Sequence, residues 1–514
     1  MGYLVGIDIG TSGVRSLVVN EEGAIVGAAT AEHPSYAPRP GWSEQEPREW
    51  WVATVESVEG ALEDAGISGK QVQGIGLSGQ MHGAVLLDAD HEVLRPAILW
   101  NDQRTHRECD EIYQRVGRER LIELTCNPAL TGFTAPKILW VRNNEPAIYE
   151  KTAKILLPKD YIRFRMSGTF ATEVSDASGT LLFAVPERTW CNEVLEKLEI
   201  DRDLMAECTE SVKVSAEVSR AAAKELGIPA GTPIVGGGGD QAAGAVGNGI
   251  VRSGVLSATL GTSGVLFAFS DEVQTDARGR VHTFCHAVPG KWHVMGVMLA
   301  AGGSFQWWRN QMSEVERQEA QAAGKETYDV LCEKAATVAP GSEGLVFLPY
   351  LTGERTPHAD PHARGGWVGL NVRHTRAHMI RSILEGVSYG MRDSLEIIRG
   401  MGIPVREIRV SGGGGRSAVW RQILADVYGH DVCTLNAGEG PAYGVALLAA
   451  TATGCYGSIE EACDAAIQIV SKTDCNPDTA AVYERYYAVY RRLYPALKDA
   501  FRTLSETVTA LHAD

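Results

Sequence analysis

The sequence predicts an α/β protein made of two related domains, each built on a mixed β-sheet. The pentapeptide Gly-Thr-Ser-Gly-Val occurs twice, at Gly10–Val14 and at Gly261–Val265, about half of the 514-residue chain apart. Each copy lies between two apolar, β-branched runs, a pattern typical of a strand, a tight turn and a second strand. Strand-like and helical stretches also alternate along both halves. We expect the two halves to face each other across a cleft.

The first half is expected to alternate between strands and helices. Apolar runs at Leu4–Ile9, Val72–Leu77 and Lys154–Leu157 have the length of strands. Pro47–Ala65 and Arg104–Val116 are longer and have helical periodicity. This alternation favours helices packed on the faces of a sheet.

The second half repeats this organisation. Strands are expected within Val255–Phe269, Trp292–Val297 and Glu407–Ser411. A long helix is expected at Thr375–Arg399, and the C-terminal stretch Thr479–Leu511 has helical periodicity. We expect this last helix to pack on the second domain.

The chain length also indicates two domains, because 514 residues are too many for a single hydrophobic core. We place the boundary so that residues 1–249 form an N-terminal domain and residues 250–514 a C-terminal domain. Each predicted domain then contains one copy of the repeated turn.

Charge argues against nucleic acid as a partner. The chain has 48 Lys and Arg against 64 Asp and Glu, a formal net charge of −16, and no basic block that could neutralise a phosphate backbone. A nucleotide is not excluded, since it needs only local N–H groups, a cation and one or two arginines.

Cysteine usage and the N-terminal segment predict a cytoplasmic protein. The ten cysteines are scattered without a Cys-x-x-Cys pair, which is typical of reduced packing residues. The first residues lack the basic region of a signal peptide. The longest apolar stretch, near Val445–Ala452, is too short to span a bilayer, so we expect no membrane partner.

Asp8 is the first candidate for chemistry. It lies near the end of the apolar run Leu4–Ile9, and only Ile9 separates it from the Gly-rich turn at residues 10–13. Such a turn presents N–H groups and hydroxyls to phosphate oxygens, and a carboxylate beside it can hold Mg²⁺. The alternative is an aspartate that only bonds the N–H groups of the turn.

Asp240 is the second candidate. The strand Pro233–Val235 leads into four glycines at 236–239 and then into Asp240, at the carboxyl end where ligands gather in α/β sheets. Phosphoryl transfer needs a carboxylate that accepts the proton of the attacking hydroxyl. The alternative is an N-cap for the helix that is expected to start near Gln241.

Further glycine-rich segments have the composition of nucleotide-binding loops. Gly412–Gly415 ends one strand and opens a helix, and Gly302-Gly303-Ser304 precedes Gln306 at another helix start. Gly74-x-Gly76-x-x-Gly79 matches a dinucleotide fingerprint, but a turn and a strand are expected after it instead of a helix. The interpretation of the chain as a dehydrogenase would depend on that match alone.

Two polar segments suit a polyol. Gln80–Gly83 offers an imidazole, and Trp100–Asp102 offers an indole face beside an amide and a carboxylate. Stacking combined with several fixed polar groups is how sites hold small polar ligands. A buried tryptophan and a core histidine are the alternative.

With these motifs in place, the chain resembles the FGGY carbohydrate kinases, within the actin-like (ribonuclease H-like) superfamily. The resemblance covers nearly the whole chain and includes Gly6–Gly13, Gly132–Trp140 and Gly365–Glu385. It implies two actin-like domains that flank a catalytic cleft, with ATP and Mg²⁺ as cofactors. Four motifs are most similar to those of members that phosphorylate D-xylulose to D-xylulose 5-phosphate: Gln80–Gly83, Ile98–Asp102, Leu157–Tyr161 and Gly353–His358.

The resemblance implies a role for each residue that matches the family's motifs. Asp240 matches the catalytic base and Asp8 a second essential carboxylate near Mg²⁺, so both are candidate metal ligands. The positions expected to contact the sugar, beside Asp240, are Met81, His82, Trp100, Asp102 and Gln241.

The remaining matches concern ATP. The positions expected to contact phosphates are Thr11, Ser12, Arg15, Gly261 and Thr262. The positions expected to hold ribose and adenine are Gly302, Gln306, Gly413 and Ser417. Relatives are often dimers, so a homodimer is also expected from the resemblance.

One position departs from the pattern. Members that act on D-xylulose often have Asn after the catalytic Asp, whereas Gln241 stands here. A family member that acts on ribulose, a pentitol, gluconate or glycerol is therefore the main alternative. A non-enzymatic, sugar-sensing actin-like ATPase is the alternative from another functional class.

Overall fold

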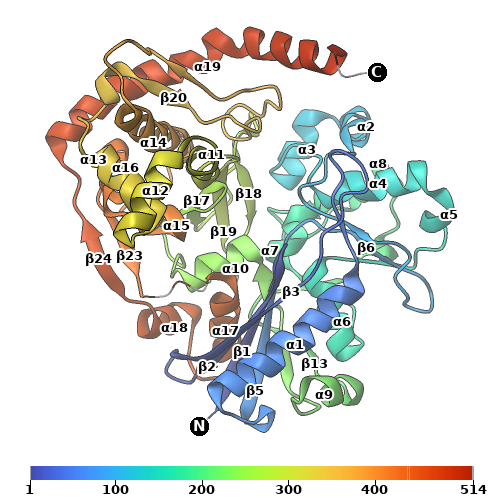
Figure 1. The fold of residues 1–514 in the computed structure, drawn as a ribbon. Coiled ribbons are helices and arrows are strands. Elements are labelled where there is room, and N and C mark those ends of the chain that lie inside the picture. Colours follow the sequence, from blue (N-terminus) through green and yellow to red (C-terminus); the bar gives the residue numbers. More distant parts are fainter. Residues whose placement is uncertain (1, 437, 439, 512–514) are drawn as a thin grey trace. The chain divides into compact units, whose positions relative to one another are not determined.

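The computed structural model describes residues 2–436, 438 and 440–511, which form two compact units (Figure 1). The first unit consists of Met1–Arg252, Phe269–His293 and Glu439–Gln468, and the second of Ser253–Ala268, Val294–Gly438 and Ile469–Asp514. The chain therefore leaves and re-enters each unit. The domain boundary between residues 249 and 250 stays a prediction.

The first unit contains a mixed sheet with the order β13-β14-β5-β1-β2-β3, in which β15 also pairs with β5. The hairpin pair β1 and β2 is antiparallel, whereas β5 is parallel to β1. This confirms the predicted strand–turn–strand unit at the first Gly-Thr-Ser-Gly-Val. The strands are β1 (Tyr3–Ile9), β2 (Gly13–Asn20), β3 (Ile25–Glu32), β5 (Val72–Gly79), β13 (Val214–Glu217), β14 (Pro233–Val235) and β15 (Gly238–Gly239).

Helices cover both faces of this sheet. On one face α1 (Pro47–Ala65) lies against β2 and β3, with the Ser16 and Ser57 hydroxyls 2.8 Å apart. On the other face α17 (Gly440–Ala452) lies directly on the backbone of β1, because a Cβ atom at Gly6 would stand 1.9 Å from the Ala442 carbonyl oxygen. The short helix α10 (Asp240–Gly247) packs beside α17 (Figure 1).

Smaller elements complete the first unit. Its remaining helices are α2 (His106–Val116), α3 (Arg118–Thr125), α4 (Thr134–Asn144), α5 (Pro146–Tyr149), α6 (Pro158–Ser167), α7 (Val174–Ala177), α8 (Asn192–Leu198), α9 (Arg220–Leu226) and α18 (Ile459–Ala466). Its remaining strands are β4 (Glu44–Gln45), β6 (Val85–Leu87), β7 (Ala97–Ile98), β8 (Lys154–Leu156), β9 (Ala171–Glu173), β10 (Phe183–Ala184), β11 (Thr189–Trp190), β12 (Glu207–Thr209) and β18 (His282–Cys285).

The second unit repeats the topology of the first sheet, with the order β19-β17-β16-β22-β23-β24. Again a hairpin, β16 with β17, is antiparallel and is followed by a strand, β22, parallel to its first member. The second copy of the pentapeptide closes this hairpin, as predicted. The strands are β16 (Val255–Leu260), β17 (Gly264–Ser270), β19 (Trp292–Met298), β20 (Val346–Leu348), β21 (Gly366–Val368), β22 (Glu407–Ser411), β23 (Val432–Leu435) and β24 (Ile469–Thr473).

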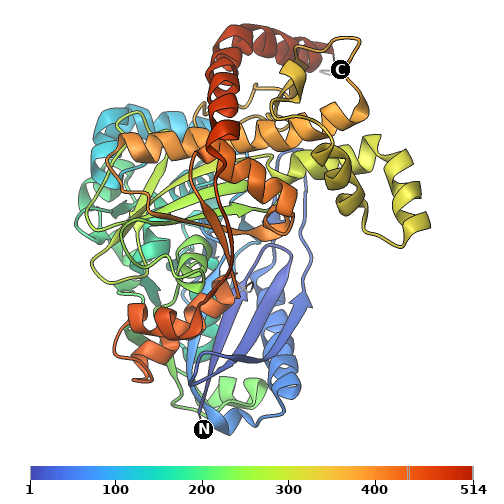
Figure 2. The ribbon, with the colours of Figure 1, turned by 90° about the vertical axis from the view of Figure 1, so that its left-hand side faces the viewer.

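The C-terminal helix belongs to the second unit, as expected from its periodicity. In Figure 2 this helix, α19 (Pro477–Leu511), is red and lies beside the orange helix α14 (Arg376–Gly400). The Tyr483 hydroxyl donates to Glu385 at 2.9 Å and the Tyr487 hydroxyl to Asp393 at 2.8 Å. The other helices are α11 (Gly302–Met312), α12 (Glu314–Ala323), α13 (Thr327–Ala336), α15 (Gly412–Gly415) and α16 (Ala418–Tyr428).

Two further properties concern the whole described chain. All ten cysteines carry free thiols, in agreement with the absence of paired motifs. Among the described residues, every helix is too short or too polar to cross a lipid bilayer.

Candidate active site

Three parallel strands of the first unit bring Asp8 and Asp240 to one edge of the sheet. Asp8 of β1 is level with Ser78 of β5, and Gly238 of β15 is level with the same serine. Asp240 directly follows β15 and is the first residue of α10. The carboxyl ends of parallel strands thus place the two carboxylates near each other.

The surroundings of the two carboxylates raise their pKa values. Burial raises the pKa of Asp8 to about 6, and burial together with the nearby Asp8 charge raises the pKa of Asp240 to about 7. Within the described part of the chain, Asp8 Oδ1 is buried without a hydrogen-bond partner. An unpaired, buried carboxylate oxygen beside a second carboxylate fits a cation that would compensate both charges.

A magnesium ion suits these two residues. Magnesium is commonly held by one or two carboxylates, with waters and substrate phosphates as its other ligands. No cluster of three or more His, Cys, Asp or Glu side chains able to hold a metal is found among the described residues. Asp8 and Asp240 would therefore bind the ion together with a phosphate and not as a complete protein cage.

The start of α10 differs from the prediction by one residue. A helix that begins near Gln241 was expected and is present, but Gly239 occupies the N-cap position and Asp240 lies inside the first turn, so the alternative of Asp240 as the N-cap is wrong. Only the position of the cap differs, because a glycine run contains no side chain that marks which residue caps the helix. A carboxylate in the first turn is stabilised by the N–H groups of the helix.

Met81 and His82 lie beside Asp240 in the same unit. A Cβ atom at Gly239 would stand 2.9 Å from Met81 Cγ, so the methionine packs on the peptide that precedes Asp240. The His82 ring packs in the same way on Gly179, whose carbonyl oxygen lies 2.7 Å from Nδ1. Gly239 and Gly179 thus leave room for the side chains of Met81 and His82, the pair predicted to contact the sugar.

A buried lysine holds the backbone of His82, which has a φ of 69°. The Lys137 ammonium donates to the carbonyl oxygens of His82 at 2.7 Å and Gly132 at 2.6 Å. Burial lowers the pKa of Lys137 well below its ordinary value. We had noted Lys137 only as part of a family motif; its contact with residue 82 could not be predicted from a lysine 55 positions away along the chain.

Trp100 and Thr11 meet at the first turn. The Trp100 indole N–H donates to Thr11 Oγ1 at 3.0 Å, and that hydroxyl donates to Gln80 Oε1 at 3.2 Å. Gln45 Nε2 donates to the Thr11 carbonyl oxygen at 2.6 Å. Gln45 was absent from the predicted site, and Gln80 was included only as part of the segment Gln80–Gly83, without a role of its own.

Asp102 is fully buried and bonded within the protein. Its carboxylate accepts from Arg104 Nη2 at 2.7 Å and from the Ser43 backbone N–H at 2.6 Å. Its expected role toward a sugar stays a prediction. Of the other turn residues, Ser12 is exposed, and Arg15, opposite Asp8 in the hairpin, donates to Thr30 at 3.0 Å.

In the second unit, the start of α11 holds the turn at 261–263. The Gly302 N–H donates to the Gly261 carbonyl oxygen at 2.9 Å, and the Gly303 N–H donates to that of Thr262 at 3.0 Å. A Cβ atom at Gly302 would stand 2.4 Å from the Gly261 oxygen, so only glycine allows this approach. Three predicted ATP-contacting residues, Gly261, Thr262 and Gly302, thus come together.

The other predicted adenosine residues are spread along neighbouring elements of that unit. Gln306 and Gly413 are exposed, on α11 and α15. Ser417 is the N-cap of α16 and accepts a hydrogen bond from the Trp420 backbone N–H at 3.3 Å. Helix capping alone accounts for a serine at this position, so its role toward ATP stays a prediction.

Comparisons with known proteins identify the family. The model of the FGGY family of carbohydrate kinases, N-terminal domain, matches residues 3–247, and that of the C-terminal domain matches residues 256–453. The chain belongs to this family.

Three similar proteins each cover nearly the whole chain. The chain is 41% identical to the xylulose kinase of Escherichia coli (strain K12), over 96% of this chain and 99% of that protein. A xyloylose kinase from Brucella ovis, known from a crystal structure, is 36% identical in sequence. Its structure matches with a TM-score of 0.88 over 96% of this chain and 99% of that one. The gluconokinase of Bacillus subtilis (strain 168) is 30% identical over 98% of both chains.

Proposed function

We propose that this chain transfers the γ-phosphoryl group of ATP to D-xylulose, which gives D-xylulose 5-phosphate and ADP. The observation that carries the proposal is the meeting of Asp8, Asp240 and Met81 at one edge of the first sheet. Membership of a carbohydrate kinase family and the identity to proteins named xylulose kinase support it.

In the proposed reaction, the sugar lies against Met81 and His82 with a terminal hydroxyl directed at Asp240. The Asp240 carboxylate accepts the hydroxyl proton while the hydroxyl oxygen forms a bond to the γ-phosphorus. The bond between that phosphorus and the β,γ-bridging oxygen breaks, and ADP leaves with the electron pair. When bound, Mg²⁺ at Asp8 and Asp240 would neutralise charge on the phosphates.

The repeated turns are proposed to contact phosphate oxygens through backbone N–H groups and the hydroxyls of Thr11, Ser12 and Thr262. Both turns are anchored from behind, by Gln45 in the first unit and by α11 in the second. We expect the reaction to take place in the cytoplasm, without nucleic acid or membrane as a partner.

The substrate is tested with a panel of acceptors. The purified chain is supplied with MgATP and with D-xylulose, D-ribulose, a pentitol, gluconate or glycerol, and ADP release is measured by a coupled assay. We expect the highest kcat/KM with D-xylulose. A preference for gluconate would mean that gluconate, and not D-xylulose, is the substrate, in line with the gluconokinase relative. If ADP release did not depend on any acceptor, a sugar-sensing ATPase would be favoured.

The base is tested with Asp240→Asn. We expect kcat to fall by about 10² to 10⁴, the usual contribution of general-base catalysis, because an amide cannot accept the proton. ATP affinity, measured by calorimetry, should change little. Asp90→Asn, at an exposed position, is the control and should retain full activity. Normal turnover by Asp240→Asn would remove Asp240 from this role.

A further inference from the structure

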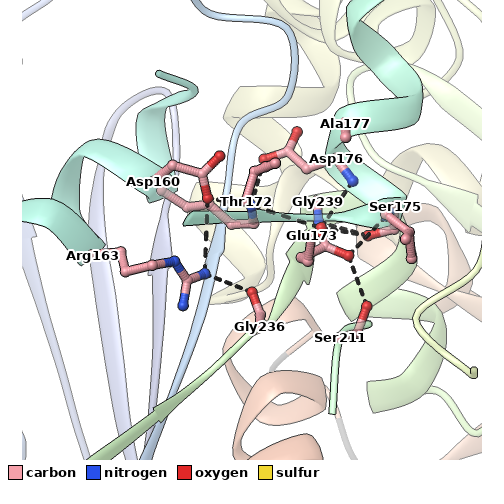
Figure 3. Close-up of polar contacts among 12 residues, drawn as sticks. Asp160, Arg163, Thr172, Glu173, Ser175, Asp176, Ala177, Ser211, Gly236 and Gly239 are labelled. Atoms are coloured by element: carbon pink, nitrogen blue, oxygen red, sulfur yellow. Dashed lines mark hydrogen bonds and ion pairs between the residues drawn. The ribbon is translucent and has the colours of Figure 1, made fainter. Parts of the chain in front are cut away.

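A buried group of charged residues lies beside Gly236 and Gly239, in the glycine segment that precedes Asp240 (Figure 3). We call it the ionic cluster. All its side chains are fully buried, and the reaction proposed above uses none of them. Its members are Lys159, Asp160 and Arg163 from α6, and Glu173 and Asp176 from β9 and α7.

Lys159 holds the carboxylates of the cluster together. Its ammonium lies 2.7 Å from Asp160 Oδ1, 3.0 Å from Asp176 Oδ2 and 3.7 Å from Glu173 Oε1. Charges buried at such a density are tolerated only with close pairing and hydrogen bonds. Lys159 thus pairs with carboxylates from α6, β9 and α7 and joins these three elements.

The two carboxylate oxygens of Glu173 accept four hydrogen bonds. Oε2 accepts from the Ser175 backbone N–H and from the Ser211 hydroxyl, both at 2.7 Å. Oε1 accepts from the Ser175 hydroxyl and from the Asp176 backbone N–H, both at 2.8 Å. This carboxylate thus orients two serine hydroxyls at once.

The two serines contact the glycine segment before Asp240 through different atoms: Ser211 accepts the Gly237 N–H at 2.8 Å with its backbone carbonyl oxygen, whereas Ser175 uses its side-chain hydroxyl. The Ser175 hydroxyl donates its hydrogen to Glu173, so its lone pairs are available to accept a hydrogen bond. Oγ accepts one from the Gly239 backbone N–H at 3.1 Å (Figure 3). Gly239 is the residue directly before Asp240, and it lies opposite Gly79 where β15 pairs with β5.

Arg163 fixes the other end of the same segment. Its guanidinium donates to the carbonyl oxygens of Val235 at 2.7 Å and Gly236 at 2.6 Å. The segment between these contacts is glycine only and includes Gly237 with a φ of 75°. Glycines have no side chains to restrict them, so the position of Asp240 depends on contacts from outside the segment.

We propose that Ser175, oriented by Glu173, is a positioning residue that fixes the Gly239 peptide and with it the direction of the Asp240 carboxylate. The proposal rests on the proposed function, in which Asp240 must meet a substrate hydroxyl. Displacements of about 1 Å at a reacting group can cost on the order of 10²-fold in rate.

The test compares Ser175→Ala with Ser211→Ala in the full-length chain. Each variant removes one hydroxyl that donates to Glu173, but only Ser175→Ala leaves the Gly239 N–H without its acceptor. We expect Ser175→Ala to lower kcat at least tenfold with KM for ATP within twofold, and Ser211→Ala to change kcat less than threefold. Equal kcat values for the two variants would overturn the proposal.

Hydrogen exchange gives a second measurement that does not depend on turnover. The Gly239 amide should exchange faster in Ser175→Ala than in Ser211→Ala or the unaltered chain, and equal exchange would overturn the proposal. If the unaltered chain turned over none of the acceptors, the proposed function would fail, yet exchange would still test the contact. Ser175→Cys, which keeps the volume with a weaker acceptor, replaces Ser175→Ala should that variant not fold, with the same expected direction.

Discussion

Lys137 and Lys159 are both fully buried in the first unit, yet their surroundings have opposite effects on their charge. Lys137 donates to two carbonyl oxygens, and burial lowers its pKa well below the ordinary value of 10.5. Lys159 also loses hydration, but the carboxylates of Asp160, Asp176 and Glu173 outweigh that loss and raise its pKa. Burial alone therefore does not decide the charge of a lysine.

The two lysines support different halves of the candidate site. Lys137 holds the backbone of His82, which is expected to contact the sugar, and Lys159 holds the ionic cluster behind Asp240. In one place the ammonium is a hydrogen-bond donor to neutral groups, and in the other it is a counter-charge. Removing each should reveal this difference.

The largest effect is expected for Lys159→Met. This variant removes the cation that lies nearest to three buried carboxylates, and breaking a buried pair typically costs about 3–5 kcal/mol of unfolding free energy. Urea denaturation measures the loss. Lys151→Met, at an exposed position, is the matched control and should differ little from the unaltered chain. A loss as small as that of the control would mean that the cluster is not held by charge.

A smaller effect is expected for Lys137→Met. It leaves two buried carbonyl groups without donors, at about 1–3 kcal/mol for an unsatisfied group, but no unpaired charge. Because the His82 backbone is then less restrained, KM for the sugar should rise more than KM for ATP. A greater loss of stability than in Lys159→Met would reverse the comparison.

The smallest effect concerns how the unfolding free energy depends on pH. The contributions of Lys137 and Lys159 to this free energy should change in opposite directions as the pH rises. Since the folded-state pKa of Lys137 is below 10.5, its contribution to stability rises with pH up to 10.5, by at most about 1.4 kcal/mol per pH unit. Asp102 and Arg104 are the charged groups that act on it. Since the folded-state pKa of Lys159 is above 10.5, its contribution is complete below 10.5 and is lost above it.

Denaturation of the unaltered chain and the two methionine variants between pH 7 and 10 measures these slopes. The stability difference between the unaltered chain and Lys137→Met should increase with pH, and that for Lys159→Met should stay level. Two level differences would show that Lys137 keeps its ordinary pKa.

Much of the fold was predictable because it depends on local patterns. The helix at Pro47–Ala65 and the strand at Glu407–Ser411 were predicted with their observed bounds, since periodicity and flanking glycines or prolines mark both. The two hairpins followed from turn residues between apolar runs. Asp8 and Asp240 stood out for the same reason, at strand ends beside glycine-rich turns.

Local patterns along the chain were thus enough to predict the main elements, the repeated turns and the two carboxylates beside glycine-rich turns. Only the tertiary structure decided that Lys137 meets His82, that Ser175 meets Gly239, and that the carboxylate of Asp102 is bonded to Arg104 and Ser43. Periodicity and turn residues report on neighbours along the chain. Most of these contacts join groups tens of residues apart, and packing of the whole unit selects such partners.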